Sequence, residues 1–237
     1  MRRVLISAGL AISLGLLPGC LAAQPATAGQ SLAGRLRILA RGQAVGSERY
    51  EINATATEIS ARGEVTLQSG NEKTRQTATL LLNPDGSLRS YEWRQEEPRK
   101  SWVRMECTAG QATIHFPRAD GTEDKQDYNL GDGRVALLDN NIFHHFLLLA
   151  RFYDFAKGGP QVIPVFIPQS VQPGLVTVEL QGVETLTVEG TPQPVRRLTI
   201  LSEDNQLVLW VTEAGRFVRL QSPQTGVEVL PETPGSN

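Results

Sequence analysis

Cysteine and histidine are scarce in this sequence and basic residues are not in excess, and each of these features excludes a class of protein. Only two cysteines occur among 237 residues, which excludes a scaffold held together by several disulfides. The formal net charge of −2 leaves no excess of basic side chains for general nucleic-acid binding. Among the three histidines, His144 and His145 are adjacent, and neighbouring side chains on a helix point about 100° apart. They are therefore poorly placed to bind one metal ion together.

Local motifs of catalysis and cofactor binding are also missing. The chain contains no G-x-S-x-G elbow, no phosphate-binding Walker loop and no H-E-x-x-H zinc motif. The acidic residues of 120–124 do not have the spacing of a calcium loop. We therefore predict no catalytic residue, no metal site and no cofactor. Two carboxylates that meet in a groove could still hydrolyse a glycoside, because that arrangement depends on the fold rather than on a motif.

A long apolar run stands near the N-terminus. Arg2 and Arg3 precede an apolar stretch over residues 4–17, which is too short to span a membrane and is typical of a secretory signal. Small and polar residues follow it, as in a tether. We therefore expect residues 1–28 to be an export signal and tether.

The end of the apolar run contains a candidate lipid anchor. Leu17-Pro18-Gly19-Cys20 resembles the bacterial lipobox, whose Cys becomes diacylated, although Pro18 departs from the small residue usual there. Ordinary signal cleavage after Ala26-Thr27-Ala28 is the alternative. We expect acylation of Cys20 and a lipid-anchored location in the cell envelope, periplasm or outer membrane, with a secreted soluble protein as the alternative. Either processing leaves Cys107 without an intrachain disulfide partner, and its strand-like surroundings predict a small buried residue.

Short segments of alternating apolar and polar residues fill most of the remaining chain. They are separated by turns rich in glycine and proline, of which the sequence has 22 and 14, and Asn83-Pro84-Asp85-Gly86 is a strong example. Such spacing is typical of an antiparallel meander. We predict a mainly β fold, a curved half-barrel or open barrel with one central helix. It forms a single domain over residues 32–230, and residues 231–237 are a disordered tail.

The central helix is predicted within residues 139–159. Side chains able to cap a helix stand just before Ile142. At about 100° per residue, one face collects the apolar side chains Ile142, Phe146, Leu149 and Tyr153. The opposite face collects His144, Leu148 and Arg151. We interpret the segment as a core helix that plugs a curved sheet, or as a lid over an apolar pocket, with Phe146 and Leu149 as ligand-contacting residues.

A hairpin over residues 88–95 and 101–108 carries the densest aromatic patch outside the helix. If Gln95 pairs with Lys100, then Trp93 faces Trp102 and Tyr91 faces Arg104. Such a cluster fits either the core face of a sheet or a platform for a lipid or sugar. Tyr91, Trp93 and Trp102 are therefore further candidate ligand-binding residues.

Two hairpin sequences and the leader together resemble a known superfamily. They are Gly42-Gln-Ala-Val-Gly46-Ser-Glu-Arg-Tyr50 and the closing pair Leu209-Trp210-Val211 and Arg216-Phe217-Val218. With the lipobox-like leader, they resemble uncharacterised bacterial envelope proteins of the lipoprotein-sorting-carrier, or half-barrel, superfamily. The resemblance implies a curved antiparallel half-barrel whose concave face, covered by helix, holds acyl chains. It carries over no site residue.

These observations lead to a functional expectation with two alternatives. We expect an exported envelope protein that binds an apolar or lipid-like ligand without catalysis, contacts the membrane through its lipid anchor and does not bind nucleic acid. An apolar concave face would favour this reading. Asp, Glu and His converging in a groove would favour an envelope hydrolase instead, and a filled core with a flat exposed face would favour a structural or interaction module.

Overall fold

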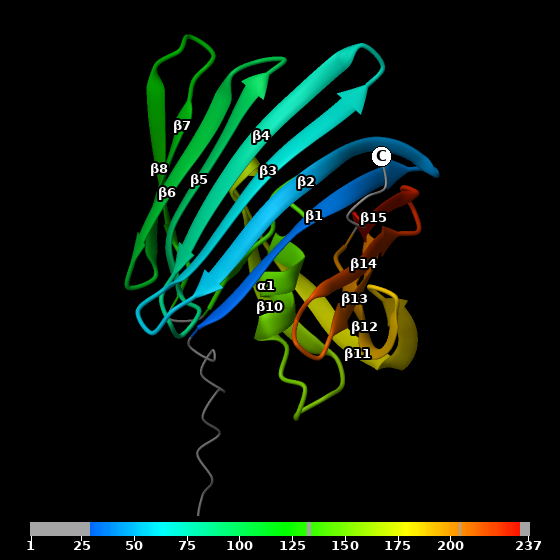
Figure 1. Ribbon diagram of the computed structural model, residues 1–237. Coiled ribbons are helices and arrows are strands. Elements are labelled where there is room, and N and C mark those ends of the chain that lie inside the picture. The colour runs from blue at the N-terminus through cyan, green and yellow to red at the C-terminus, as the bar shows by residue number, and fades with distance from the viewer. Residues whose placement is uncertain (1–28, 132–133, 204, 233–237) are drawn as a thin grey trace, which may run out of the picture.

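The computed structural model describes residues 29–131, 134–203 and 205–232. The predicted export signal and tether, with Cys20, lie outside the described residues, as does the tail after Glu232. Within them, one short α-helix lies between the two halves of a large curved sheet (Figure 1). The predicted mainly β, open and curved architecture with one helix is therefore confirmed.

Hairpins build the sheet in chain order. In the first half of the sheet, each strand from β1 to β8 lies beside the next one in the chain. On its other side, β1 pairs with β15, the final strand of the chain. From β15 the neighbouring strands follow in reverse chain order to β9. All neighbours are antiparallel except β9 and β10. The strands of the first half are β1 (Gln30–Ala40), β2 (Gln43–Ala54), β3 (Ile59–Ser69), β4 (Glu72–Leu82), β5 (Leu88–Glu97), β6 (Ser101–Thr108), β7 (Gln111–Pro117) and β8 (Glu123–Asn129). The second half comprises β9 (Ala136–Leu137), β10 (Gln161–Ile167), β11 (Gln172–Val188), β12 (Thr191–Leu201), β13 (Gln206–Thr212), β14 (Phe217–Ser222) and β15 (Val227–Pro231).

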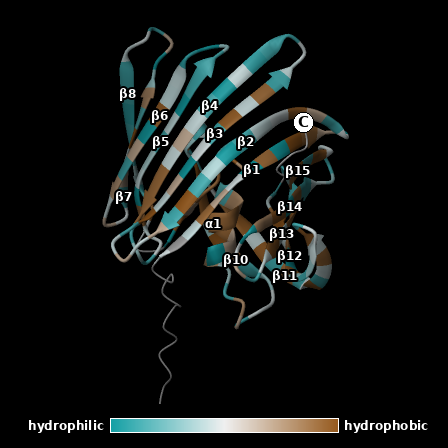
Figure 2. Ribbon diagram, in the orientation of Figure 1, coloured by the Kyte–Doolittle hydropathy of each residue, from teal (hydrophilic) through white to brown (hydrophobic). Residues whose placement is uncertain are grey.

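Alternation of side chains fixes which face of each strand is buried. In β2, Tyr50, Ile52 and Ala54 are buried on the concave face, while Arg49 and Glu51 lie on the other face. The apolar and polar bands that alternate along β1 to β5 in Figure 2 show the same pattern. The core therefore fills the concave side of the sheet, and the convex side faces water.

Two of the strands are long and contain internal glycines. β3 runs unbroken through Arg62 and Gly63, and β11 runs through residues 175–188 with a register shift between Leu180 and Gly182. In β3 the glycine allows another side chain to approach the sheet closely.

The predicted pairing of the β5–β6 hairpin was wrong by one residue. Gln95 pairs with Ser101 rather than Lys100, so Trp93 is opposite Val103. A shift of one residue moves a side chain to the other face of a sheet. Trp93 is consequently buried, whereas Trp102, opposite Arg94, lies half-buried on the other face, and the predicted pair of tryptophans does not form.

The helix α1 (His145–Phe152) is shorter than predicted and buried on nearly every side. The predicted cap by Asp139, Asn140 or Asn141 was wrong, because the N-cap position is His144 and no local side chain caps it. On the face opposite the apolar stripe, His144 and Leu148 are buried as well, and Arg151 is exposed. A carboxylate from a distant strand takes the place of the local cap.

The two ends of the open sheet approach each other through side chains. Tyr128 of β8 donates a hydrogen bond of 3.1 Å to the carbonyl of Val171, which follows the short 3-10 helix η1 (Pro168–Ser170). The Tyr128 ring also packs edge-on against Phe166 of β10, with ring centroids 5.2 Å apart. These contacts bring β8, at one end of the strand order, close to β10, the neighbour of β9 at the other end.

Candidate ligand-binding site

Two cavities are lined by α1 and by the adjoining segment that precedes it. Their volumes are about 610 Å³ for cavity 1 and about 680 Å³ for cavity 2, within the usual range for small-molecule sites. Cavity 1 takes four of its lining residues from α1, Leu147, Leu148, Ala150 and Arg151. Cavity 2 takes Phe143 and Phe146 from the start of the helical segment.

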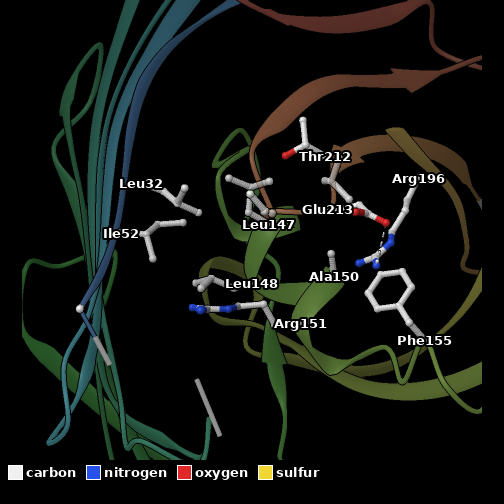
Figure 3. A pocket seen from close by; sticks show the side chains of 14 residues that line it. Leu32, Ile52, Leu147, Leu148, Ala150, Arg151, Phe155, Arg196, Thr212 and Glu213 are labelled. Carbon is white, nitrogen blue, oxygen red and sulfur yellow. Dashed lines mark ion pairs between the residues drawn. The ribbon is translucent and has the colours of Figure 1, made fainter. Parts of the chain in front are cut away.

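Cavity 1 lies between α1, the first strands and the β13–β14 turn. Leu32 of β1 and Ile52 of β2 lie opposite Leu147 and Leu148 of the helix (Figure 3). Its remaining wall comprises Gly29, Phe155, Arg196, Val211, Thr212, Glu213, Ala214 and Gly215. The cavity thus combines an apolar wall with a small number of charged groups, which is the usual composition of a ligand site.

Cavity 2 lies against the second half of the sheet. Its apolar wall consists of Leu138, Phe143, Phe146, Val165, Ile167, Leu175, Val176, Ile200, Leu207, Leu220 and Val227. Its charged lining residues are both acidic, Asp139 and Glu203. Leu175 is 63% exposed, so an apolar side chain stands open to water at this cavity.

A buried carboxylate from β2 holds the start of the helix. Oε2 of Glu48 accepts hydrogen bonds from the backbone N–H groups of Phe143 (2.9 Å) and His144 (3.1 Å), and Oε1 lies 2.6 Å from Nδ1 of His144. Glu48 and His144 are both fully buried. These two N–H groups belong to the turn that leads into α1, so Glu48 holds the start of the helix against β2.

Gly63 of β3 makes room for this pair. A Cβ atom at Gly63 would lie 2.6 Å from Cε1 and 2.8 Å from Nδ1 of His144, and 3.0 Å from Oε1 of Glu48. Distances under about 3 Å from Cβ to such atoms are steric clashes. The absence of a side chain at position 63 is therefore required for the imidazole to pack against the sheet.

A second buried network surrounds Asp139. Its Oδ2 accepts a 2.6 Å hydrogen bond from the hydroxyl of Tyr91, and its Oδ1 accepts one of 3.1 Å from the backbone N–H of Gln169. The ring of His145 packs edge-on against both Tyr91 and His144. In the described part of the chain, neither ring nitrogen of His145 has a hydrogen-bond partner.

Burial determines the protonation of these groups. It raises the pKa of Glu48 to about 8, although the two backbone donors act in the opposite direction. Burial lowers the pKa of His144 to about 3 and, helped by His144, places the pKa of His145 well below its ordinary value. Burial also raises the pKa of Asp139 to about 6, against its hydrogen bonds. With its pKa near 8, Glu48 is mainly protonated at pH 7. Because Oε2 accepts the two backbone N–H groups, we assign the proton to Oε1, which faces Nδ1 of neutral His144.

These acids and histidines converge, but not in a groove. Glu48, His144 and His145 line neither cavity, and only Asp139 reaches cavity 2. Among residues 29–131, 134–203 and 205–232, no group of three or more His, Cys, Asp or Glu side chains could hold a metal ion. The arrangement fastens the helix to the sheet and gives a substrate no access to the imidazoles.

The candidate residues predicted from sequence occupy different environments. Phe146 is half-buried and lines cavity 2, whereas Leu149 is fully buried and lines neither cavity. Tyr91 and Trp93 are buried in the core. Trp102 lies half-buried on the other face of the sheet. Cys107 is a half-buried free cysteine, with burial raising its pKa.

Sequence reasoning missed Glu48 and the residues of cavity 1. The signal for Glu48 was present, since it shares the face of Tyr50 and Ile52, where an acidic residue is out of place. Arg196 and Phe155 gave no signal, because segments far apart in the chain bring them together.

Comparisons with known proteins give one distant structural likeness. No family model and no curated protein matches the chain. A crystal structure of a DUF1089 family protein from Pseudomonas aeruginosa superposes with a TM-score of 0.48 and 12% sequence identity, covering 75% of this chain and 90% of that one. With a TM-score below 0.5, this mainly β neighbour assigns the chain to no family.

Proposed function

We propose that the protein is an exported cell-envelope protein, anchored through Cys20, that binds an apolar or lipid-like ligand beside α1. The observation that carries the proposal is the pair of cavities lined by the helical segment and the concave face of the sheet. Their volumes, about 610 and 680 Å³, suit a small amphiphile, and their walls are mainly apolar. The half-barrel carriers that the sequence resembles hold acyl chains on the corresponding face.

A non-catalytic role fits the site better than hydrolysis. The hydrolase alternative needs acidic and histidine side chains in reach of a substrate. Here Glu48, His144 and His145 are enclosed between the sheet and the helix. The hydrogen bonds of Glu48 have a structural use, because they hold the turn that leads into α1 against β2.

Ligand binding is tested by thermal unfolding with a panel of fatty acids, lysophospholipids and neutral lipids. A ligand that binds only the folded state stabilises it by RT ln(1 + [L]/Kd), or about 2.7 kcal/mol at a hundredfold excess over Kd. We therefore expect the melting temperature to rise with concentration for at least one lipid class. A panel that leaves the melting temperature unchanged would contradict the proposed binding.

The proposed anchor is tested separately. Cys20→Ala should release the protein from the membrane fraction, and labelled palmitate should enter the wild-type chain only. A single acyl chain gives marginal membrane binding, so stable attachment implies more than one. Wild-type protein without label would contradict acylation of Cys20 and leave ordinary signal cleavage as the alternative. No helix in the described ranges is long and apolar enough to cross the bilayer.

A further inference from the structure

We infer that cavity 1 binds an anionic amphiphile, with the acidic head group at Arg196 and the hydrocarbon chain against α1. This inference rests on the proposed binding of a lipid-like ligand and adds the site and the charge of that ligand. The head group is a carboxylate or a phosphate monoester, as in a fatty acid or a lysophospholipid acid.

Charge distinguishes the two cavities. Cavity 1 is lined by two guanidinium groups, Arg151 and Arg196, and by one carboxylate, Glu213. The charged residues of cavity 2 are Asp139 and Glu203, and none of its lining residues is basic. An anion is therefore favoured in cavity 1 and disfavoured in cavity 2.

Arg196 is held in position for an anion. Its guanidinium carbon lies 4.1 Å from the centroid of the Phe155 ring, so the ring supports one face of the group. The side chain is 26% exposed, and Figure 3 shows its tip directed toward Phe155 and Glu213 at the edge of the cavity. A planar guanidinium with a fixed orientation can bind a carboxylate or phosphate through two parallel hydrogen bonds.

The ion pair that Arg196 already makes with Glu213 does not prevent anion binding. Oε1 of Glu213 lies 3.7 Å from Nη2 of Arg196, and the Glu213 side chain is 64% exposed. An exposed ion pair of this length contributes little free energy. A ligand anion that enters the cavity can therefore take over the guanidinium while Glu213 turns toward water.

An apolar path leads from the charged edge into the molecule. Leu147, Leu148 and Ala150 present one side of α1 to the cavity, and Ile52 lies across from them on β2 (Figure 3). These four side chains are each at most 7% exposed, so they form an interior wall. Arg151 extends from the helix toward the same strand and adds a second positive charge. A chain lying along this wall would remove its apolar surface from water.

The test compares ligands that share a dodecyl chain and differ in head group. Dodecanoate, dodecyl phosphate, dodecanol and dodecyltrimethylammonium, each below its critical micelle concentration, are titrated into the purified full-length chain by calorimetry. We expect dodecanoate or dodecyl phosphate to bind at least about tenfold more tightly than dodecanol, because a charge-assisted hydrogen bond is lost in the alcohol. The relative affinities of the two anions distinguish carboxylate from phosphate.

A matched pair of variants locates the head group. Arg196→Gln should weaken binding of the anion about ten- to a hundredfold and leave dodecanol unchanged. Arg219→Gln is the control, because Arg219 also lies over an aromatic ring, that of Trp210, and pairs with a glutamate, Glu228, but lines neither cavity. Circular dichroism and thermal unfolding establish that both variants are folded.

The outcomes separate the inference from the proposed function. Equal affinity for dodecanoate, dodecyl phosphate and dodecanol, preference for the ammonium, or equal effects of the two arginine variants would overturn the anionic site while leaving lipid binding intact. Failure of all four ligands to bind would count against the proposed function and the inference together. Selective loss of anion binding in Arg196→Gln alone is the result that the structure predicts.

Discussion

Replacing Glu48 by Gln should flatten the dependence of stability on pH above neutrality. Gln keeps the shape of the protonated carboxyl and can make the same hydrogen bonds: its carbonyl oxygen accepts from Phe143 and His144, and its amide donates to Nδ1 of His144. The variant therefore retains the packing of α1 and loses only the ability to ionise. It separates the charge of this buried residue from its role as a cap.

The size of this pH effect on stability follows from the pKa of Glu48, which burial raises from its ordinary value of 4.5 to about 8. Between these values the folded state holds a proton that the unfolded chain has released, so the free energy of unfolding falls as pH rises. The histidines act oppositely, since the pKa of His144 is about 3 against 6.5, and this opposing effect fades within about one pH unit above 6.5. The effect of Asp139, whose pKa is about 6, fades over the same interval. From pH 6.5 to 8 the contribution of Glu48 falls by about 2 kcal/mol, at about 1.4 kcal/mol per pH unit, and the histidines offset part of this loss in the wild type and in the variant alike.

Urea unfolding at about pH 6.5 and about pH 8 measures this difference. The wild type should lose stability across the interval, Glu48→Gln should not, and Glu51→Gln, on the same strand but facing water, should behave as the wild type. Glu48→Leu should cost about 3–5 kcal/mol at either pH, because it leaves the backbone N–H groups of Phe143 and His144 and the imidazole of His144 without their partner. Parallel curves for the wild type and Glu48→Gln would refute the buried, protonated carboxyl.

Two further predictions concern the packing around α1. Gly63→Ala should destabilise the fold by about 1–3 kcal/mol in thermal unfolding, because the new methyl group meets His144, whereas Gly174→Ala, where a Cβ finds only an ordinary 3.4 Å contact with Val165, should change little. A harmless Gly63→Ala would disprove the close approach. Leu149→Ala should cost about 2–5 kcal/mol, and Phe146→Ala should cost less than the 3–5 kcal/mol of a core phenylalanine, because Phe146 is half-buried beside cavity 2. Equal and large losses would show that cavity 2 is filled core.

Local periodicity was sufficient to predict the fold but not the cap of its helix. Alternation in segments such as β2 and β4 depends only on which side chains face the core, so the strands and the curved sheet could be predicted. The acceptor for the N–H of Phe143 is Glu48, 95 residues earlier in the chain. The side chains just before Ile142 therefore wrongly indicated a local cap. Asp139 instead accepts hydrogen bonds from the hydroxyl of Tyr91 and the backbone N–H of Gln169.

Predictions that depended on register or on distant contacts were the least successful. To place Trp93 and Trp102, the register of the β5–β6 pair had to be known to within one residue. The predicted register was wrong by one residue, so Trp102 lies on the other face of the sheet from Trp93. Cavity 1 draws on β1, β2, α1, β12 and β13, so no local pattern could have marked Arg196 or Phe155 as neighbours. The apolar arc around a helix, by contrast, is a local property, and it contains both Phe146, which lines cavity 2, and Leu149, which is buried in the core.

Native mass spectrometry of the protein purified from its own membrane tests lipid binding most directly. We predict a population heavier than the processed chain by the mass of a small amphiphile, which is lost on collisional activation. Ala150→Phe, which places a ring in cavity 1, should reduce that population, whereas Gly174→Phe, in cavity 2, should not. A wild-type protein that carries no ligand, and gains none after incubation with the membrane's own lipids, would contradict the proposed function.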